Sequence, residues 1–374
     1  MKNIPATKPS FSQKDIKSIT KEFKDILSGK SFLSQSKFGE IFEAKFSKFI
    51  GTKYAVTCNS GTSALELIFR ALDVKNKEVI LPSNTFIATA NAIMNAGGIP
   101  VFADCNNDMC LDFDKTINLV NDKTVAICHV HIGGLVTDSA LKLAKYCKKN
   151  KLFFVEDAAQ AHGSSINKLM AGNLGDAAGF SFFSTKVMTT GEGGIVTTNN
   201  RKLVTKMKSI REFGKVKKGI YTNYHTSMGY NWRMPEVSAL MGLAQLNSIG
   251  SFIQKRAKIA KIYDSYFLNL DTVRVIKPVK TSNFNYFKYT LILKKGNRKK
   301  IHEALTKEGI NLSGYVYEIP LHKQPVFKDF NSLTLPETEN LCAQHICLPI
   351  YPDLSIKDAI FIGKTALKII DKLS

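Results

Sequence analysis

The sequence has no long apolar run and no cysteine pattern of the metal-binding kind. None of its 374 residues lies in a stretch that approaches the roughly 18 apolar residues of a membrane-spanning helix. The beginning, MKNIPATKPSFSQKD, has no apolar segment of the secretory type, so we do not expect a secreted protein. The seven cysteines are scattered without a CxxC pair, which favours reduced, mostly buried thiols in a cytosolic protein and no metal site.

Arginine and acidic residues are few compared with lysine. The chain carries 52 basic and 31 acidic residues, a net charge of +21, and only seven of the basic residues are arginine. Such an excess raises the hypothesis of nucleic-acid binding. The charge is spread along the whole chain, however, and folded nucleic-acid-binding domains depend on the two-pronged contacts of arginine. We therefore expect no nucleic-acid partner; the charge either attracts small anionic substrates or reflects a lysine-rich genome.

Short apolar segments alternate with amphipathic stretches through the first two-thirds of the chain. This alternation predicts an α/β fold with a mainly parallel sheet covered by helices on both faces. The predicted strands are Tyr54–Cys58, Glu78–Leu81, Pro100–Ala103, Val125–Val130, Leu152–Glu156, Ala178–Phe183 and Gly194–Thr198. The predicted helices are Lys14–Leu27, Phe38–Phe49, Thr62–Leu72, Thr85–Asn95 and Asp138–Lys149.

The last third of the sequence has a different pattern. Two helices, Pro235–Ser248 and Ser251–Phe267, are predicted first. Strands at Val273–Ile276 and Phe287–Leu293 and helices at Arg298–Glu308 and Ser355–Lys372 follow. We predict an N-terminal and large α/β domain over residues 1–249 and a small C-terminal α+β domain over residues 250–374.

Lys186 stands between a strand-like segment and a turn. The stretch FSFFSTKVMTTGEGG places it after aromatic residues and before glycines that allow the chain to turn tightly. A lysine at such a place attacks carbonyl groups when burial lowers the pKa of its amine. A surface lysine before a turn is the plainer alternative, so other residues must decide.

An aspartate and a Ser-Gly-Thr turn precede this lysine. FFVEDAAQAHG puts Asp157 at the end of an apolar strand, where α/β proteins place ligand-facing groups. An aspartate there either caps a helix or keeps a pyridine nitrogen protonated, which makes pyridoxal 5′-phosphate (PLP) an electron sink. CNSGTSALELIFRAL ends a strand and begins a helix, whose free N–H groups and hydroxyls can hold a phosphate. Phosphate site, aspartate and lysine in this order indicate a PLP site.

These segments resemble the DegT/DnrJ/EryC1/StrS family of PLP-dependent nucleotide-sugar aminotransferases. The resemblance covers nearly the whole chain. It includes FGEIFEAKFSKFIGTKYAVTCNSGTSAL, ILPSNTFIATANAIMNAGGIPVFADC, EDAAQAHG, FSFFSTKVMTTGEGG, GYNWRMPEVSALMGLAQL, IPLHKQPVF and CLPIYPDLS. It implies the aspartate-aminotransferase (type I) fold of PLP-dependent transferases.

The resemblance also implies a role for each matching residue. Lys186 forms the Schiff base with PLP and carries the proton, Asp157 pairs with the pyridine nitrogen, and Gln160 contacts the phenolic oxygen. The other implied cofactor contacts are Gly61, Thr62, Ser63 and Ser181 near the phosphate, Phe86 on the ring, and Asn231 from a neighbouring subunit. The last of these implies a homodimer with composite active sites. Tyr317 and His322 are candidate substrate contacts, with polar residues at the rim of the site as the alternative.

The implied reaction is a ping-pong transamination in amino-sugar biosynthesis. L-Glutamate is the expected amino donor. The expected acceptor is the keto group, at C4, of a nucleotide-linked deoxy sugar. Lysine at position 186 argues against the dehydratases of the family, which carry histidine there. The alternatives are a PLP-binding regulatory protein and a dehydratase-like member. Two segments depart from the family pattern: FLSQSKFG lacks a Gly-Pro pair, and His131-Ile132-Gly133-Gly134 has an additional glycine.

Overall fold

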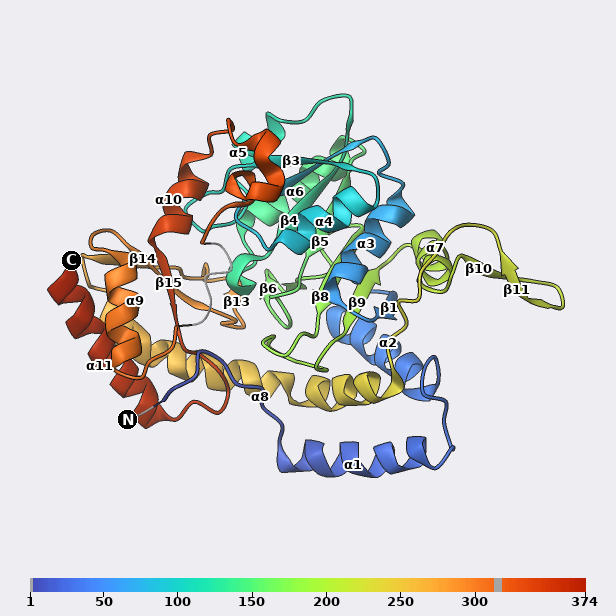
Figure 1. Ribbon diagram of the computed structural model, residues 1–374, viewed down its shortest axis with the longest axis horizontal. Coiled ribbons are helices and arrows are strands. Elements are labelled where there is room, and N and C mark those ends of the chain that lie inside the picture. The colour runs from blue at the N-terminus through green and yellow to red at the C-terminus, as the bar shows by residue number, and fades with distance from the viewer. Residues whose placement is uncertain (1–2, 313–317) are drawn as a thin grey trace.

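The computed structural model describes residues 3–312 and 318–374 of the chain (Figure 1). Its main sheet has seven strands in the order β1-β9-β8-β5-β4-β2-β3. All neighbouring strands are parallel except at β9, which is antiparallel to β1 and β8. The bounds are β1 Tyr54–Cys58, β2 Glu78–Pro82, β3 Ile99–Ala103, β4 Thr124–Val130, β5 Phe153–Asp157, β8 Ala177–Ser181 and β9 Gly194–Thr198. The prediction of a mainly parallel sheet is confirmed.

Helices cover both faces of this sheet. In β2, Val79 and Leu81 belong to one hydrophobic core and Ile80 between them to another, as alternating side chains require. One face is covered by α3 Gly61–Leu72, α4 Ile87–Asn95 and α7 Arg201–Arg211. The other is covered by α2 Lys37–Ile50, α6 Asp138–Lys149 and the first half of α8 Glu236–Phe267. Because both faces are buried, the strands are apolar along almost their whole length.

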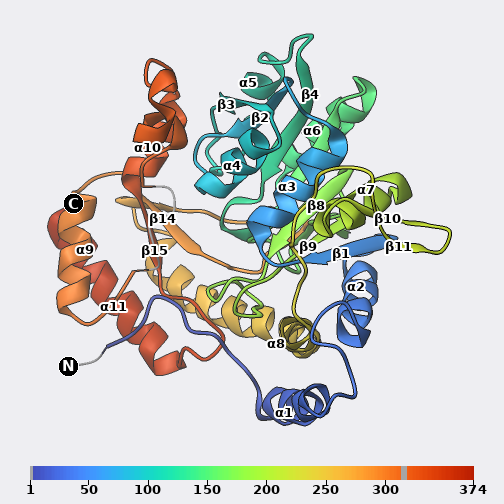
Figure 2. The same ribbon diagram turned by 45° about the vertical axis from the view of Figure 1, so that its right-hand side comes forward.

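The long helix α8 corrects one prediction. The sequence predicted two helices separated near Gly250, but residues Glu236–Phe267 form a single helix of 32 residues. A glycine inside a helix costs about 1 kcal/mol relative to alanine. Figure 2 shows α8 beside α2, α11 Ile356–Leu373 and the outermost helix α1 Gln13–Leu27. Packing of α8 against these three helices stabilises the uninterrupted helix.

A smaller antiparallel sheet lies at the other end of α8. Its order is β12-β14-β15, with β12 Val273–Val275, β14 Tyr289–Leu293 and β15 His345–Leu348. The helices α9 Arg298–Lys307 and α11 pack with it and with the last turns of α8 in a separate core. Since α8 crosses residues 249 and 250 without interruption, the domain division at this point stays a prediction.

One segment of the C-terminal part packs against the large sheet. Leu321, Phe327 and Leu335 lie in the core that contains α3 and α4. The ring of Phe102 in β3 contacts those of Phe327 and Phe330, with centroid distances of 5.2 and 5.0 Å. The helix α10 Pro336–Gln344 follows. The sequence analysis did not predict α7, α10 or β15.

A hairpin projects from the large sheet's side of the molecule (Figure 1). It consists of β10 Lys215–Lys218 and β11 Tyr221–His225, and every residue of β11 is exposed. Other short elements are α5 Phe113–Ile117, β6 Ser165–Ile166, β7 Leu169–Met170 and β13 Ser282–Asn283.

All seven cysteines are buried free thiols, as predicted. Within residues 3–312 and 318–374, no helix is both long and apolar enough to cross a membrane.

Candidate active site

A cavity of about 270 Å³ lies where β5 and β8 end beside the first turn of α3. Its walls come from the segments that follow β1, β2, β5 and β8. The residues that line it are Ser60, Gly61, Thr62, Leu65, Thr85, Phe86, Ala88, Thr89, Asp157, Ala159, Gln160, Ser181, Phe183, Lys186 and Glu192. Most of the cofactor contacts inferred from the sequence are therefore brought to one place: Gly61, Thr62, Phe86, Asp157, Gln160, Ser181 and Lys186.

The first turn of α3 forms one end of the cavity. Ser60 caps the helix, because its hydroxyl accepts a hydrogen bond from the Ser63 N–H and contacts the Ser63 hydroxyl at 3.0 Å. Ser63 is thus engaged in the cap and does not line the cavity, whereas Gly61 and Thr62 do. The N–H groups of a first helical turn have no partner within the helix and suit an anion.

Two glycines allow this end of the cavity to be narrow. A Cβ at Gly61 would lie 2.5 Å from the Cβ of Ser181, and one at Gly194 would lie 2.1 Å from the carbonyl oxygen of Ser60. The absence of side chains at both positions lets α3 approach the ends of β8 and β9 closely. The Ser-Gly-Thr and Gly-Gly motifs therefore meet in space.

Asp157 is a buried carboxylate at the end of β5. Its Oδ2 accepts a hydrogen bond of 2.7 Å from the Thr89 hydroxyl, and its Oδ1 accepts one of 3.1 Å from the Ala159 N–H. Burial raises the pKa of this carboxyl above its ordinary value, although both hydrogen bonds oppose the shift. A carboxylate whose charge is disfavoured by burial gains from a cation placed in the adjoining cavity.

Gln160 is fixed by the segment after β4. Its Oε1 accepts a 2.8 Å hydrogen bond from the Gly133 N–H. At Gly134, where φ is +89°, a Cβ would lie 2.6 Å from the Gln160 carbonyl oxygen. The glycine at position 134 thus lets the backbone pass closely by Gln160.

Lys186 lies beside Phe287, and Lys288 follows Phe287 immediately before β14. The Lys186 Nζ is 5.2 Å from the centre of the Phe287 ring, and the Lys288 Nζ is 5.1 Å from the same centre. Burial lowers the pKa of Lys186 from 10.5 to about 8; the charge of Asp157 opposes the shift and that of Lys288 adds to it. A substantial fraction of Lys186 is therefore neutral, and nucleophilic, near physiological pH.

The remaining predicted residues lie elsewhere. Asn231 is exposed, forms a bridge with Glu212 and does not line the cavity of its own chain. His322 is fully buried between Ser83 and Glu339 and does not line it either. Tyr317 lies outside the described residues. Their roles stay predictions.

The sequence analysis missed several lining residues. Glu192 belongs to the GEGG motif, whose glycines predict only a tight turn. Thr89 belongs to the NTFIATANA segment that contains Phe86. The signal for Thr89 is its place in the predicted helix Thr85–Asn95: it follows Thr85 by four positions, and residues at this spacing in a helix are neighbours. The approach of Phe287 and Lys288 had no local signal.

The sequence profile of the DegT/DnrJ/EryC1/StrS aminotransferase family matches residues 13–365. The chain belongs to this family. It is 31% identical over 375 residues to the UDP-4-amino-4,6-dideoxy-N-acetyl-β-L-altrosamine transaminase of Helicobacter pylori, covering 98% of both chains. It is 32% identical over 366 residues to the GDP-perosamine synthase of Escherichia coli O157:H7, covering 97% of both. The solved structure of Helicobacter pylori PseC, an aminotransferase of pseudaminic acid biosynthesis, matches with a TM-score of 0.92 at 30% identity over 100% of both chains.

These matches confirm the predicted family, the type I fold and the PLP dependence of the chain. A sugar aminotransferase of Streptococcus pneumoniae has been solved in PLP and PMP forms. The cavity fits this cofactor on its own evidence. The cavity has anion-binding N–H groups and a hydroxyl at one end, which would suit a phosphate. Its buried carboxylate of raised pKa would suit a protonated ring nitrogen, and its lysine of lowered pKa would suit an aldehyde.

The pKa of Lys186 gives a testable prediction. Covalent attachment of PLP to the apoprotein needs the neutral amine, so its rate should rise with pH and reach half its maximum near the Lys186 pKa of about 8. Lys288→Met removes a positive charge that lowers this pKa, so the half-point should move to higher pH. Stopped-flow absorbance of apoprotein mixed with PLP measures the rate. Lys288→Arg keeps the charge and should leave the half-point near that of the wild type, while an unchanged half-point in Lys288→Met would contradict the assignment.

Proposed function

We propose that this family member transfers an amino group from L-glutamate to the C4 keto group of a nucleotide-linked deoxy sugar. The observation that supports this most strongly is the meeting of Lys186, Asp157 and the first turn of α3 around one cavity. The names of the two matched relatives contain a UDP-linked and a GDP-linked sugar, and the name of the Helicobacter pylori transaminase contains a 4-amino-4,6-dideoxy sugar, which supports amination at C4. The net charge of +21 favours approach of a diphosphate substrate.

The bound cofactor supplies an aldehyde and a protonated ring that accepts electrons from the substrate carbon. Asp157 holds the proton on the pyridine nitrogen, and Thr89 fixes the carboxylate by its 2.7 Å hydrogen bond. Gly61, Thr62 and Ser181 hold the phosphate, while the exposed ring of Phe86 lies at the cavity wall for stacking. Lys186 would hold the aldehyde, and its neutral Nζ would accept the proton from Cα of the amino donor.

We further propose a homodimer in which Asn231 reaches the phosphate site of the partner. Asn231 is exposed, and so are large hydrophobic side chains on the β10–β11 hairpin and its flanks: Phe213 at 47%, Ile220 at 89% and Met228 at 91%. Apolar side chains gathered in this way on the hairpin and its flanks are typical of a surface that another chain covers. The buried free thiols support a cytoplasmic location.

Two half-reactions test the function. Glutamate added to the PLP-loaded enzyme should bleach the visible band of the bound cofactor and release 2-oxoglutarate. A nucleotide-linked 4-keto-6-deoxy sugar should then restore the band and appear in the mass spectrum as the amino sugar. A panel of UDP-, GDP- and TDP-linked sugars identifies the acceptor. A band that no amino acid changes would instead support a PLP-binding regulatory protein, and loss of a sugar hydroxyl without amination would support a dehydratase.

A further inference from the structure

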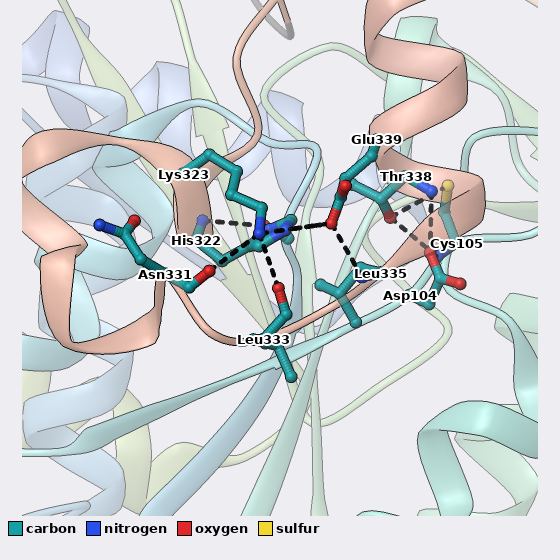
Figure 3. Close-up of polar contacts among 10 residues, drawn as sticks. Asp104, Cys105, His322, Lys323, Asn331, Leu333, Leu335, Thr338 and Glu339 are labelled. Atoms are coloured by element: carbon teal, nitrogen blue, oxygen red, sulfur yellow. Dashed lines mark hydrogen bonds and ion pairs between the residues drawn. The ribbon is translucent and has the colours of Figure 1, made fainter.

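A buried hydrogen-bond network joins the C-terminal segment to the end of β2 (Figure 3). Ser83 follows β2 directly and is fully buried. Its hydroxyl lies 2.7 Å from Nδ1 of His322 and accepts a 3.1 Å hydrogen bond from the His322 N–H. Its carbonyl oxygen accepts a 2.8 Å hydrogen bond from the Leu321 N–H. Three contacts thus fix Ser83 to the turn that contains His322.

The ring of His322 is held in one protonation state. Its Nε2 lies 2.9 Å from Oε1 of Glu339, and a carboxylate only accepts hydrogen bonds, so Nε2 carries the proton. Burial lowers the pKa of His322, which keeps the ring neutral and leaves Nδ1 as an acceptor. The Ser83 hydroxyl therefore donates to Nδ1, and the order of donation runs from Ser83 through His322 to Glu339.

The far end of the network is anchored to β3. The Thr338 N–H, in the first turn of α10, donates a 2.8 Å hydrogen bond to Asp104, which follows β3. Glu339 also accepts a 3.1 Å hydrogen bond from the Leu335 N–H. Figure 3 shows Lys323 between the Asn331 and Leu333 carbonyl oxygens, to each of which its Nζ donates a hydrogen bond of 2.9 Å. The Lys323 Nζ also lies 3.7 Å from Oε1 of Glu339, so this ion pair and the Leu335 N–H hold the carboxylate that meets His322.

The near end of the network reaches the cavity. Thr85 and Phe86, which line the cavity, follow Ser83 by two and three positions. The Thr85 hydroxyl contacts that of Thr89 at 3.2 Å, and Thr89 donates to Asp157. A displacement of Ser83 would therefore shift both the Phe86 ring and the support of the Asp157 carboxylate.

We propose that His322 is a positioning residue that acts on the cofactor site through Ser83. This inference rests on the proposed function and replaces a direct substrate contact by His322. The neutral ring accepts from Ser83 and donates to Glu339, and so holds the Ser83–Phe86 segment in the place where Phe86 and Thr85 close the cavity. Loss of the His322 ring should weaken the binding of PLP more than the binding of the sugar.

Two replacements of His322 separate its two contacts. In His322→Asn, the side-chain oxygen can take the place of Nδ1 and accept from Ser83, but nothing reaches Glu339. In His322→Gln, the longer amide can reach Glu339, but the Ser83 hydroxyl loses its acceptor. The dissociation constant of PLP, measured by fluorescence titration of each apoprotein, should rise roughly tenfold in His322→Gln and Ser83→Ala and stay near the wild-type value in His322→Asn.

His345→Asn is the matched control. His345 is also buried, and its Nδ1 donates to the Leu341 carbonyl oxygen, away from the cavity. This variant should lose thermal stability without a change in the PLP dissociation constant. If His322→Gln does not fold, Ser83→Ala, which removes a single oxygen atom, decides the question.

Two outcomes would overturn the proposal. One is a PLP dissociation constant that does not change in Ser83→Ala. The other is a raised KM for the sugar in His322→Asn with unchanged PLP binding, which would show direct substrate contact. The titrations need no turnover, so they remain informative if the wild-type enzyme aminates no sugar, a result that would refute the proposed function instead.

Discussion

Lys186→Ala is expected to lower kcat by about 10⁴-fold or more, the upper end of what a positioned acid–base group contributes. Alanine removes both the amine that holds PLP covalently and the base for the donor Cα. The fold should survive, because the Lys186 ammonium is disfavoured by its surroundings, as its pKa of about 8 indicates. PLP should still bind through the phosphate and ring contacts, since those belong to other residues.

Borohydride reduction followed by peptide mass spectrometry provides a second measurement. In the wild type the PLP mass should be fixed on the peptide that contains Lys186, and in Lys186→Ala on none. Lys186→Arg keeps a long cation but has no neutral form near pH 7, so it should be as inactive as the alanine variant. Lys202→Ala, on the exposed face of α7, is the control and should keep wild-type kcat. Near-normal turnover in Lys186→Ala would refute the assignment of the catalytic lysine.

The sheet and part of the site were predictable because their signals are local. Each strand of the main sheet is a short apolar run, and the carboxyl ends of parallel strands lie at one edge of a sheet. For this reason Asp157, at the end of β5, and the Ser-Gly-Thr turn after β1 could be expected to lie close together. Knowledge of the family supplied the roles of Gln160 and Phe86, which the pattern alone could not.

The rest depends on contacts between distant segments. Phe287 and Lys288 approach Lys186 because the segment before β14 is bonded to the loops after β4 and β5, where the Lys288 N–H donates to Gly133 and the Asn285 amide to Gln160. Nothing near them in sequence indicates this. The sequence offers His322 as a candidate substrate contact or a rim residue. Its observed partners, Ser83 at 239 positions' distance and Glu339 in a helix that the sequence did not predict, have no local signal. Helix α8 is a further difference: the sequence predicted two helices, Pro235–Ser248 and Ser251–Phe267, and the structure has the single helix Glu236–Phe267.

Asp157→Asn should separate function from stability. The replacement removes the charge that holds the proton on the pyridine nitrogen, so kcat should fall by about 10³-fold, the upper end of the effect of one electrostatic partner. The apoprotein should melt at the same temperature or higher, because burial raises the pKa of Asp157 and the free carboxylate is therefore a cost to the fold. The amide can still accept from Ala159 and donate to Thr89, so the cavity should keep its shape.

Asp176→Asn is the matched control for this substitution. Asp176 is more exposed than Asp157, but partial desolvation also raises the pKa of its carboxyl, which accepts a 2.9 Å hydrogen bond from the Phe154 N–H and lies outside the cavity. Steady-state kinetics and thermal melting of both variants should show a loss of kcat confined to Asp157→Asn. If Asp157 serves catalysis through its charge, Asp157→Asn lowers turnover without lowering the melting temperature. A loss of both turnover and melting temperature in this variant would indicate a structural role for the carboxylate. Retention of full activity would mean that another group keeps the ring nitrogen protonated.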